Sequence, residues 1–185
     1  MEQIPYLQLR ETIRNGDCIL WQGTGFVPWA IMKWTDYSHA SLVVRFQEAK
    51  GFEERVHIVE SLSGGLKFNC LSYRLEKDKG RAFLFQPNCL WQNSQERIRV
   101  AAINDKVRGI KYDYKGLFTN LLGRVNNDAG RYFCSEFVWV KWGENGVLGN
   151  GNLTELGEKM LKKNKAPRPG DIPLWMNGKL TEIIA

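Results

Sequence analysis

Long apolar runs are missing from this chain of 185 residues. No window approaches the roughly 18 uninterrupted apolar residues that a membrane-spanning helix needs. The first residues, MEQIPYLQLRETIRNGD, also contain no apolar core of signal-peptide length. We therefore expect a cytoplasmic protein without stable insertion into a membrane.

Cysteine and histidine are scarce, with four and two residues respectively. The cysteines, which are Cys18, Cys70, Cys89 and Cys134, lie far apart and form no CxxC pair. Such spacing signals neither a zinc site nor a disulfide framework. We expect no metal and no organic cofactor, and each cysteine has to be judged by its own surroundings.

Acidic residues are fewer than basic ones, 20 against 26, which gives a formal net charge of +6. A basic chain suits a polyanionic partner only where its positive charges are concentrated. Here the densest basic runs are KDKGR and KKNK, which are typical of a solvated surface. We therefore expect no nucleic-acid partner.

Linkers and repeats are also absent, because no low-complexity or Pro/Gly/Ser-rich stretch divides the sequence. Of all residues, 43% are hydrophobic, and charges of both signs are spread along the chain. A chain of this length and composition can bury a substantial core. We expect a single domain that spans residues 1–185.

Segments rich in β-branched and aromatic residues alternate with turn signals. They predict strands at 18–23, 39–46, 55–62 and 81–87. The second and third of these strands flank a polar stretch that contains glycine, so they are predicted to form a hairpin. The C-terminal run LTEII is predicted to follow an irregular segment and a final turn.

Helices are predicted where apolar residues recur at helical spacing between start and stop signals. They are expected at 28–34, 93–109, 112–123 and 134–142. Pro28 suits the first turn of the first helix, and Asn93 with Glu96 resembles a capping box at the start of the second. These elements predict an α+β fold in which helices pack on an antiparallel sheet.

The stretch RYFCSEFVWVKW, residues 131–142, places one cysteine before an almost continuously apolar run. A helix that is apolar on every side is buried. If this helix begins near Cys134, the thiol lies among unpaired N–H groups at the positive end of the helix dipole, which favours the thiolate. That is the chemistry of a nucleophile; a small core residue beside Phe133 and Phe137 is the alternative.

His39 stands at the start of the first hairpin strand, where a side chain can point out of the end of the sheet. A hairpin folded about a midpoint near Lys50 places Arg45 opposite Glu54 and His39 opposite Glu60. Paired side chains on one face are about 5 Å apart. Glu60 would then fix one nitrogen of the imidazole and leave the other for a thiol.

His57 is the competing histidine. In the same register it opposes Leu42 and faces away from His39, so we interpret it as a surface or packing residue. The assignment of Glu60 depends on the register, because a slip of one residue would move its carboxylate to the other face of the sheet.

Five segments, GDCILWQGTG, YSHASLVV, HIVES, KYDY and RYFCSEFVWV, follow one another in an order that matches a known family. They resemble the YiiX-like, circularly permuted branch of the NlpC-type papain-like cysteine hydrolases, which is related to lecithin–retinol acyltransferase. The match covers most of residues 15–140, and PRPGDIP at 167–173 resembles the approach to that family's last strand. The stretch 146–165 matches nothing in the pattern.

The resemblance implies a permuted papain-like fold with its nucleophile at the N-terminus of a buried helix. It implies Cys134 as the nucleophile, His39 as general base and acid, and Glu60 as the residue that orients His39. Three neighbours in the motifs are expected on the substrate-binding side of the site: Tyr37, Ser38 and Ser135.

The implied activity is cleavage of an amide bond in a peptide or cell-wall-like substrate through a thioacyl-enzyme. Two alternatives stay open. One is a lipid-directed thioesterase or acyltransferase, in which the stripe FVPWAIMKW beside the histidine would line an acyl site. The other is a non-catalytic binding module. The expected partner of either enzyme is a small peptide-like or acyl substrate.

Overall fold

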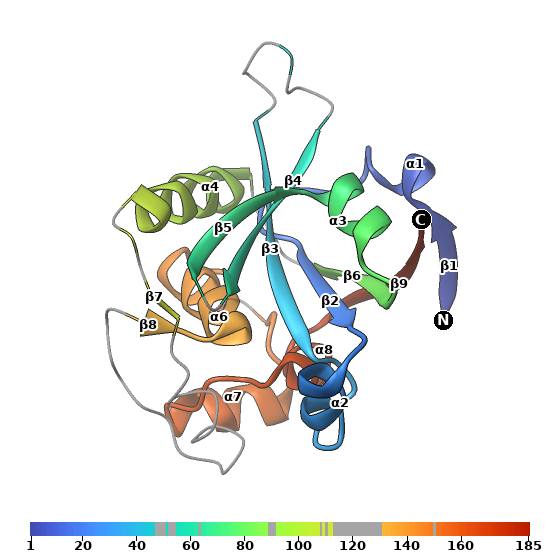
Figure 1. Cartoon of the computed structure of the whole chain (residues 1–185). Coiled ribbons are helices and arrows are strands. Elements are labelled where there is room, and N and C mark those ends of the chain that lie inside the picture. The colour runs from blue at the N-terminus through green and yellow to red at the C-terminus, as the bar shows by residue number, and fades with distance from the viewer. Residues whose placement is uncertain are drawn as a thin grey trace.

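A seven-stranded sheet lies at the centre of the structure, which is a computed structural model (Figure 1). The residues that the structure describes are 1–46, 51, 55–62, 64–88, 92–107, 109, 111–112, 131–149 and 151–185. In spatial order, the strands are β1 (Glu2–Pro5), β9 (Gly178–Ile184), β6 (Arg81–Pro87), β2 (Cys18–Gln22), β3 (His39–Arg45), β4 (Val56–Leu62) and β5 (Gly65–Cys70). A separate pair joins β7 (Lys111–Tyr112) to β8 (Arg131–Tyr132).

The sheet is antiparallel except at one edge. From β9 to β5, each neighbouring pair of strands is antiparallel, as predicted. At the edge, β1 pairs with β9 in parallel, from Glu2 opposite Thr181 to Pro5 opposite Ile184. The prediction of a purely antiparallel sheet is wrong here, because no short hairpin fixes the relative direction of two strands from opposite ends of the chain.

Helices cover both faces of the sheet. They are α1 (Tyr6–Leu9), α2 (Phe26–Met32), α3 (Leu71–Lys77), α4 (Gln92–Val107), α6 (Cys134–Glu144), α7 (Glu155–Lys162), the 3₁₀ turn η1 (Pro169–Asp171) and α8 (Ile172–Trp175). α4 and α6 pack on one face, and α1 and α3 on the other (Figure 1). This arrangement confirms the α+β class. Among the described residues, no helix is both long and apolar enough to cross a membrane.

Strand β2 contributes side chains to two separate hydrophobic cores, because successive side chains of a strand point to opposite faces. Cys18 and Leu20 join the core beneath α6, whereas Ile19 and Trp21 join the core beneath α3. All four side chains are buried. This explains why the strand reads as a continuous apolar run rather than an alternating one.

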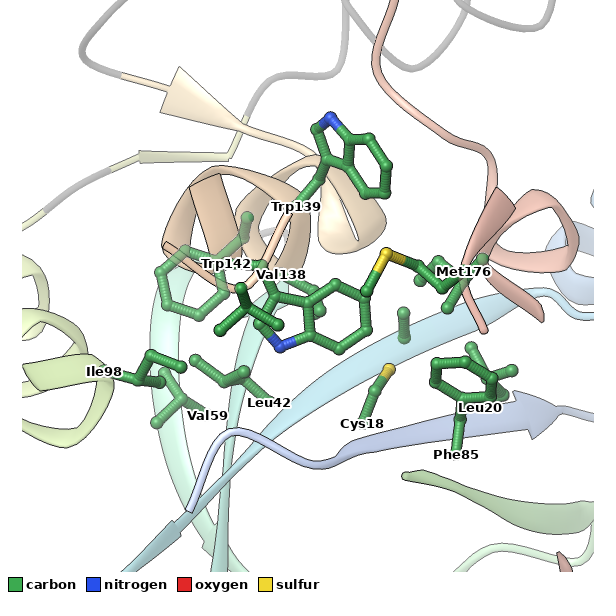
Figure 2. Close-up of a cluster of buried hydrophobic side chains, with 14 of the residues drawn as sticks. Cys18, Leu20, Leu42, Val59, Phe85, Ile98, Val138, Trp139, Trp142 and Met176 are labelled. Atoms are coloured by element: carbon green, nitrogen blue, oxygen red, sulfur yellow. The ribbon is translucent and has the colours of Figure 1, made fainter. Parts of the chain in front are cut away.

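Trp142 ties α6 to the sheet. Its indole Nε1 donates a hydrogen bond of 2.8 Å to the carbonyl of Gly16, in the turn before β2. Its ring lies in the same core as Val138 and Leu42, between α6 and the strands (Figure 2). The long aromatic side chain therefore fixes both the distance and the rotation of α6 over β3.

The β3–β4 hairpin is paired two residues away from the predicted register. Arg45 lies opposite Val56, whereas the prediction placed it opposite Glu54 and placed His39 opposite Glu60. The side-chain period of a strand is two, so a shift of two leaves every residue on its predicted face. The hydrophobic pattern therefore cannot distinguish the two registers. Glu54 itself lies outside the described residues.

Part of the prediction falls outside the described residues, namely Cys89 and all but the first residue of the helix expected at 112–123. That first residue, Tyr112, belongs to β7 and not to a helix. The helix predicted at 93–109 is α4, which ends at Val107. Asn93 lies inside α4, so it is not the N-cap that the sequence pattern indicated.

The stretch 146–165, to which the family pattern assigned nothing, contains α7. The Thr154 side chain caps this helix by accepting a 3.1 Å hydrogen bond from the N–H of Gly157. A Cβ atom at position 157 would lie 2.1 Å from the carbonyl oxygen of Trp175. Only glycine allows this approach, which brings α7 against α8 just before the last strand.

We predict that Leu42→Ala lowers the free energy of unfolding by about 2 to 5 kcal/mol, because it leaves a cavity beneath α6. Leu42 has no exposed surface. Leu7→Ala is the matched control, since Leu7 is 71% exposed, and a change of about 0.5 kcal/mol or less is expected there. Urea unfolding followed by circular dichroism measures both. Equal losses in the two variants would contradict the described core.

Candidate active site

Cys134 is the first residue of α6, and its side chain is buried. The first N–H of this helix with a backbone partner is that of Phe137, which donates to the carbonyl of Phe133 over 3.0 Å. In the same first turn, the N–H of Ser135 favours the ionised form of the Cys134 thiol. The thiol therefore lies at the positive end of the α6 dipole.

Two buried contacts hold the first turn of α6 in place. Ser135 Oγ donates a 2.7 Å hydrogen bond to the carbonyl of Pro167, and the Glu136 carboxylate accepts one of 3.3 Å from the N–H of Phe133. The Ser135 hydroxyl is thus turned away from any substrate and is fully buried. The substrate-binding side chain expected at this position is instead a contact that anchors the helix.

The ladder between β3 and β4 ends before the strands do. Its last pair is Leu42 and Val59, although β3 begins at His39 and β4 continues to Leu62. Ala40, which lies beyond the last pair, donates its backbone N–H to the Cys134 thiol. The end of the ladder thus frees a backbone donor for the thiol at the start of α6.

His39 is fixed by the residue before it. The N–H of Ser38 donates to the carbonyl of Trp21 over 2.8 Å, and Ser38 Oγ accepts a 3.0 Å hydrogen bond from the N–H of Gly23. These bonds join the start of β3 to the end of β2, where His39 lies opposite Trp21. Ser38 therefore positions the imidazole through the backbone.

The imidazole of His39 lies between a thiol and a carboxylate. Its Nε2 is 3.0 Å from Oε1 of Glu60, and the Cys134 thiol is the side-chain neighbour that most favours the charged form of the ring. Because Glu60 occupies Nε2, Nδ1 is the nitrogen that remains for the thiol. The three residues that the sequence predicted as a site are thus brought together, with His39 between the other two.

Glu60 has no exposed surface, and four side chains donate to or pair with its carboxylate. Besides His39, these are Ser41 Oγ at 3.2 Å, Asn69 Nδ2 at 2.6 Å and Arg74 Nε at 3.5 Å. Each donor favours the ionised form, which a buried carboxylate requires. The carboxylate is therefore held ionised and in one orientation against the imidazole.

Asn69 and Arg74 are functional neighbours that the sequence reasoning missed. They belong to β5 and α3, neither of which was predicted. In the β4–β5 pairing, Glu60 lies opposite Lys67, so Asn69 is its diagonal neighbour on the same face. A strand prediction at 65–70 would have found Asn69, whereas nothing in the sequence indicates the long-range contact of Arg74.

The charged groups of the site stabilise one another. Burial alone would raise the pKa of the Cys134 thiol, but the His39 imidazolium and the N–H groups of Ala40 and Ser135 lower it below its ordinary value. Burial would lower the pKa of His39, but the Cys134 thiolate and then the Glu60 carboxylate raise it to about 10. The geometry therefore favours a thiolate–imidazolium pair near neutral pH.

The pKa of Glu60 moves in the opposite sense. Burial would raise it, but the hydrogen bond and charge of His39, followed by the charge of Arg74 and the hydrogen bond of Asn69, lower it to about 2. Glu60 thus stays ionised wherever the protein is folded near neutral pH. Its negative charge is one reason why the half-buried imidazolium persists.

Tyr37 lies in the core beneath α6 and packs edge-on against Phe83, with 5.1 Å between the ring centroids. Burial raises the pKa of its phenol. Because the ring is 5% exposed, its position favours a role in shaping the wall behind His39 over contact with a substrate.

A pocket of about 280 Å³ opens beside His39. Its lining residues are Trp21, Gly23, Thr24, Val27, Pro28, Ile31, Ser38, His39, Leu62, Arg74 and Asp78. One wall is therefore the apolar side of α2, and the opposite wall carries the Arg74–Asp78 ion pair, 2.6 Å long. Of the three residues expected at the substrate, Ser38 is the one that reaches this pocket.

His57 lies away from the site, as predicted. It is opposite Val44 in β3, and its ring packs edge-on against Phe46 with 5.2 Å between the centroids. Burial and the neighbouring charge of Arg55 lower the pKa of His57. It therefore belongs to the packing between the hairpin strands.

No group of three or more His, Cys, Asp or Glu side chains in the described part of the chain is arranged to hold a metal ion. The site residues form a line rather than a shell, because His39 lies between Glu60, which occupies its Nε2, and Cys134. Their donor atoms therefore do not converge on a common point.

The sheet, its helices and this site define an α+β protein with a cysteine–histidine–glutamate arrangement. No family model matches the chain, and no curated protein sequence matches it. A solved structure is similar: the crystal structure of the metalloprotein YiiX from Escherichia coli O157:H7, with a TM-score of 0.55 and 20% identity over 93% of this chain and 88% of that chain. The chain therefore has the YiiX-like fold that its motifs led us to expect.

We predict that iodoacetamide modifies Cys134 faster than Cys18 at about pH 6 to 7, because the thiolate is the reactive form. The pKa of Cys134 is lowered, whereas burial raises that of Cys18 well above its ordinary value. Mass spectrometry of the labelled peptides measures the rates. Partly exposed Cys70 serves as the reference for an accessible thiol.

His39→Ala is the control for this experiment. Loss of the imidazolium removes the main charge that lowers the pKa of Cys134, so its labelling rate at about pH 6 should fall at least about tenfold. Labelling of Cys70 should stay unchanged. Equal labelling of Cys134 and Cys18 in the folded protein would contradict a low-pKa thiol.

Proposed function

We propose that this protein is a cysteine hydrolase in which residues 1–185 form one circularly permuted papain-like domain. In this proposal Cys134 is the nucleophile, His39 the general acid and base, and Glu60 the residue that orients His39. The observation that carries the proposal is the line of side chains in which His39, hydrogen-bonded to Glu60, also lowers the pKa of the buried Cys134 thiol. Buried charges of this kind are costly, and their presence in a packed domain favours a functional role.

The chemistry begins with attack of the Cys134 thiolate on a substrate carbonyl, which forms a bond from Sγ to carbon and leaves an oxyanion. The His39 imidazolium gives its proton to the leaving amine as the carbon–nitrogen bond breaks. A thioacyl-enzyme remains. Neutral His39 then removes a proton from water, which attacks the thioester, and the acid product leaves as the thiolate and the imidazolium form again.

The oxyanion needs donors that are already in place. The first turn of α6 supplies backbone N–H groups next to the thiol, and we assign the N–H of Cys134 to this role because it precedes the first intrahelical hydrogen bond of α6. The contact of Ser135 with Pro167 supports the assignment, since it fixes that turn.

The mechanism contains no step through a metal. YiiX is described as a metalloprotein, but the donors around Cys134 in this chain are engaged with one another in a line. The described residues therefore do not fit a metal centre, and a thiolate activated by an imidazolium does not need one.

The proposed substrate is a small amide, peptide-like or cell-wall-like. The pocket beside His39 supports this assignment, because its volume of about 280 Å³ suits a compact group. The apolar side of α2 and the Arg74–Asp78 pair would contact opposite sides of that group.

A lipid-directed thioesterase or acyltransferase is the second candidate. The observation that favours it is the position of α2, none of whose residues is buried. The stripe FVPWAIMKW is therefore not core, and its inner side chains Val27, Pro28 and Ile31 line the pocket. The same thiolate chemistry would act on an ester or thioester, with an alcohol or thiol as the leaving group.

We predict that Cys134→Ala abolishes turnover, and that the wild-type protein hydrolyses amides in preference to acyl esters. A panel of peptide amides and of phospholipid and thioester substrates, followed by mass spectrometry, measures both. Preferential ester or thioester cleavage would select the second candidate. Absence of both turnover and selective Cys134 labelling would leave the non-catalytic binding module and overturn the proposed enzyme.

We predict that Glu60→Gln reduces turnover by about 10- to 10⁴-fold while the fold is retained. The neutral amide no longer stabilises the imidazolium, so the pKa of His39 falls from about 10. The thiolate–imidazolium pair exists between the pKa of Cys134 and that of His39, so the alkaline limb of the kcat/KM profile should move to lower pH.

Glu182→Gln is the matched control. Glu182 also pairs with an arginine, since Arg81 Nε and Nη2 lie 2.6 and 2.8 Å from its carboxylate oxygens. It does not contact His39, so its loss should leave the pH profile unchanged. Wild-type turnover and an unchanged profile in folded Glu60→Gln would contradict the orienting role.

A further inference from the structure

Helix α2 presents aromatic side chains to solvent. Phe26 is 78% exposed, Trp29 51% and Trp34, just beyond the helix, 65%. Val27 is also exposed, so four large apolar side chains are exposed within nine residues. Single exposed apolar residues are ordinary, but a contiguous group of this kind marks an interaction surface.

The rings on α2 contact one another and a cation. Phe26 packs against Trp29, with 5.7 Å between the ring centroids, and the Lys33 ammonium lies 3.9 Å from the centroid of Trp29. The pair combines an apolar indole with a positive charge over the face of its ring. Such a combination is typical of side chains at the boundary between water and lipid.

Charge on this segment has one sign. Between Gln22 and Thr35 the sequence contains a single charged residue, Lys33, and no acid. The whole chain carries a formal net charge of +6. An anionic surface therefore meets no acid within α2, the nearest in sequence being the exposed Asp36 just beyond Trp34, and is attracted to the net positive charge of the protein.

The surface also adjoins the candidate active site. Val27, Pro28 and Ile31 face the pocket that contains His39, while Phe26, Trp29 and Trp34 face solvent. α2 lies at the end of the sheet where β3 begins (Figure 1). Whatever covers the outer side of α2 is thus brought to the rim of the pocket.

We propose that the α2 surface, formed by Phe26, Val27, Trp29, Lys33 and Trp34, docks the protein on an anionic lipid surface. The seven-residue helix lies in the plane of the interface and does not span the bilayer. The aromatic rings enter the headgroup region, and Lys33 pairs with lipid phosphate. A substrate that partitions into the interface then enters the pocket beside His39 directly.

A lipid surface explains these observations better than a protein partner. Protein interfaces combine aromatic anchors with an extensive polar rim. The α2 segment instead combines Trp, Phe and Val with one lysine, which is the composition of an interfacial anchor. Trp34 adds a second indole at the end of the helix, next to the chain segment of Arg168, which donates to its backbone carbonyl over 3.1 Å.

Vesicle flotation tests the proposal with Cys134→Ala protein, so the result does not depend on catalysis. Vesicles of phosphatidylglycerol and phosphatidylcholine in equal parts should carry the protein, whereas pure phosphatidylcholine vesicles should carry much less. Raising NaCl from about 0.15 M to about 1 M should release most of it, because the Debye length falls from about 8 Å to about 3 Å.

Two matched pairs of variants locate the surface. Trp29→Ala and Lys33→Glu should each weaken the partition coefficient about tenfold. Tyr73→Ala and Lys77→Glu are the controls, because Tyr73 is 56% exposed and Lys77 lies over its ring at 5.6 Å, on α3 outside the α2 surface. The controls should change binding less than about twofold.

Three results would overturn the proposal: no flotation of the parent protein, equal binding to neutral and anionic vesicles, or equal effects of the α2 variants and their α3 controls. Circular dichroism of each variant checks that the fold is retained. Loss of the proposed hydrolase activity would leave all three measurements unaffected, so failure of the docking surface and failure of the enzyme assignment are distinguishable.

Discussion

A half-buried imidazole held between a buried thiol and a buried carboxylate is the interaction on which the rest of this site depends. Moving charges out of water is costly, so the pair formed by Cys134 and His39 requires compensation from every side. Glu60 supplies a negative charge, and Asn69 and Arg74 keep that charge ionised. On the other side, backbone N–H groups at the start of α6 and in β3 stabilise the thiolate. Each set of neighbours offsets the desolvation cost of the charged group that it surrounds.

The sheet makes this arrangement possible because its ladder is incomplete. If β3 and β4 stayed paired beyond Leu42 and Val59, the Ala40 N–H would be directed to a neighbouring strand rather than to the thiol. The helix that brings the thiol is placed from two ends. Trp142 fixes one end to the turn before β2, and Ser135 fixes the other to the segment before the last strand. The geometry of the site is therefore a property of the whole sheet.

The sequence singled out three residues that the structure brings together, but not the residues that support them. His39 and Glu60 share a face in both the predicted and the observed register, since the two registers differ by two residues. Cys134 was found from the boundary between a polar loop and an apolar run, which is a local signal. Asn69 and Arg74 were missed because they reach Glu60 from β5 and α3, whose short, mixed sequences carry little periodicity.

Helix α2 illustrates a different limit of sequence reasoning. Its apolar stripe was identified correctly as helical, but an aromatic stripe has the same composition whether it faces a core or a solvent boundary. Whether the stripe faces a core or solvent depends on the rest of the fold. Here the cores of the sheet are already filled by α1, α3, α4 and α6.

The triad chemistry does not by itself choose between amide and ester, because a thiolate attacks either carbonyl. Selectivity must therefore come from the walls of the pocket. One wall is aliphatic and continuous with the exposed rings of α2, and the other carries the Arg74–Asp78 pair. The same Arg74 touches Glu60 over 3.5 Å, so a polar group bound at this wall would perturb the orientation of the Glu60 carboxylate. Substrate recognition and the charge of the proposed triad are thus linked through one guanidinium.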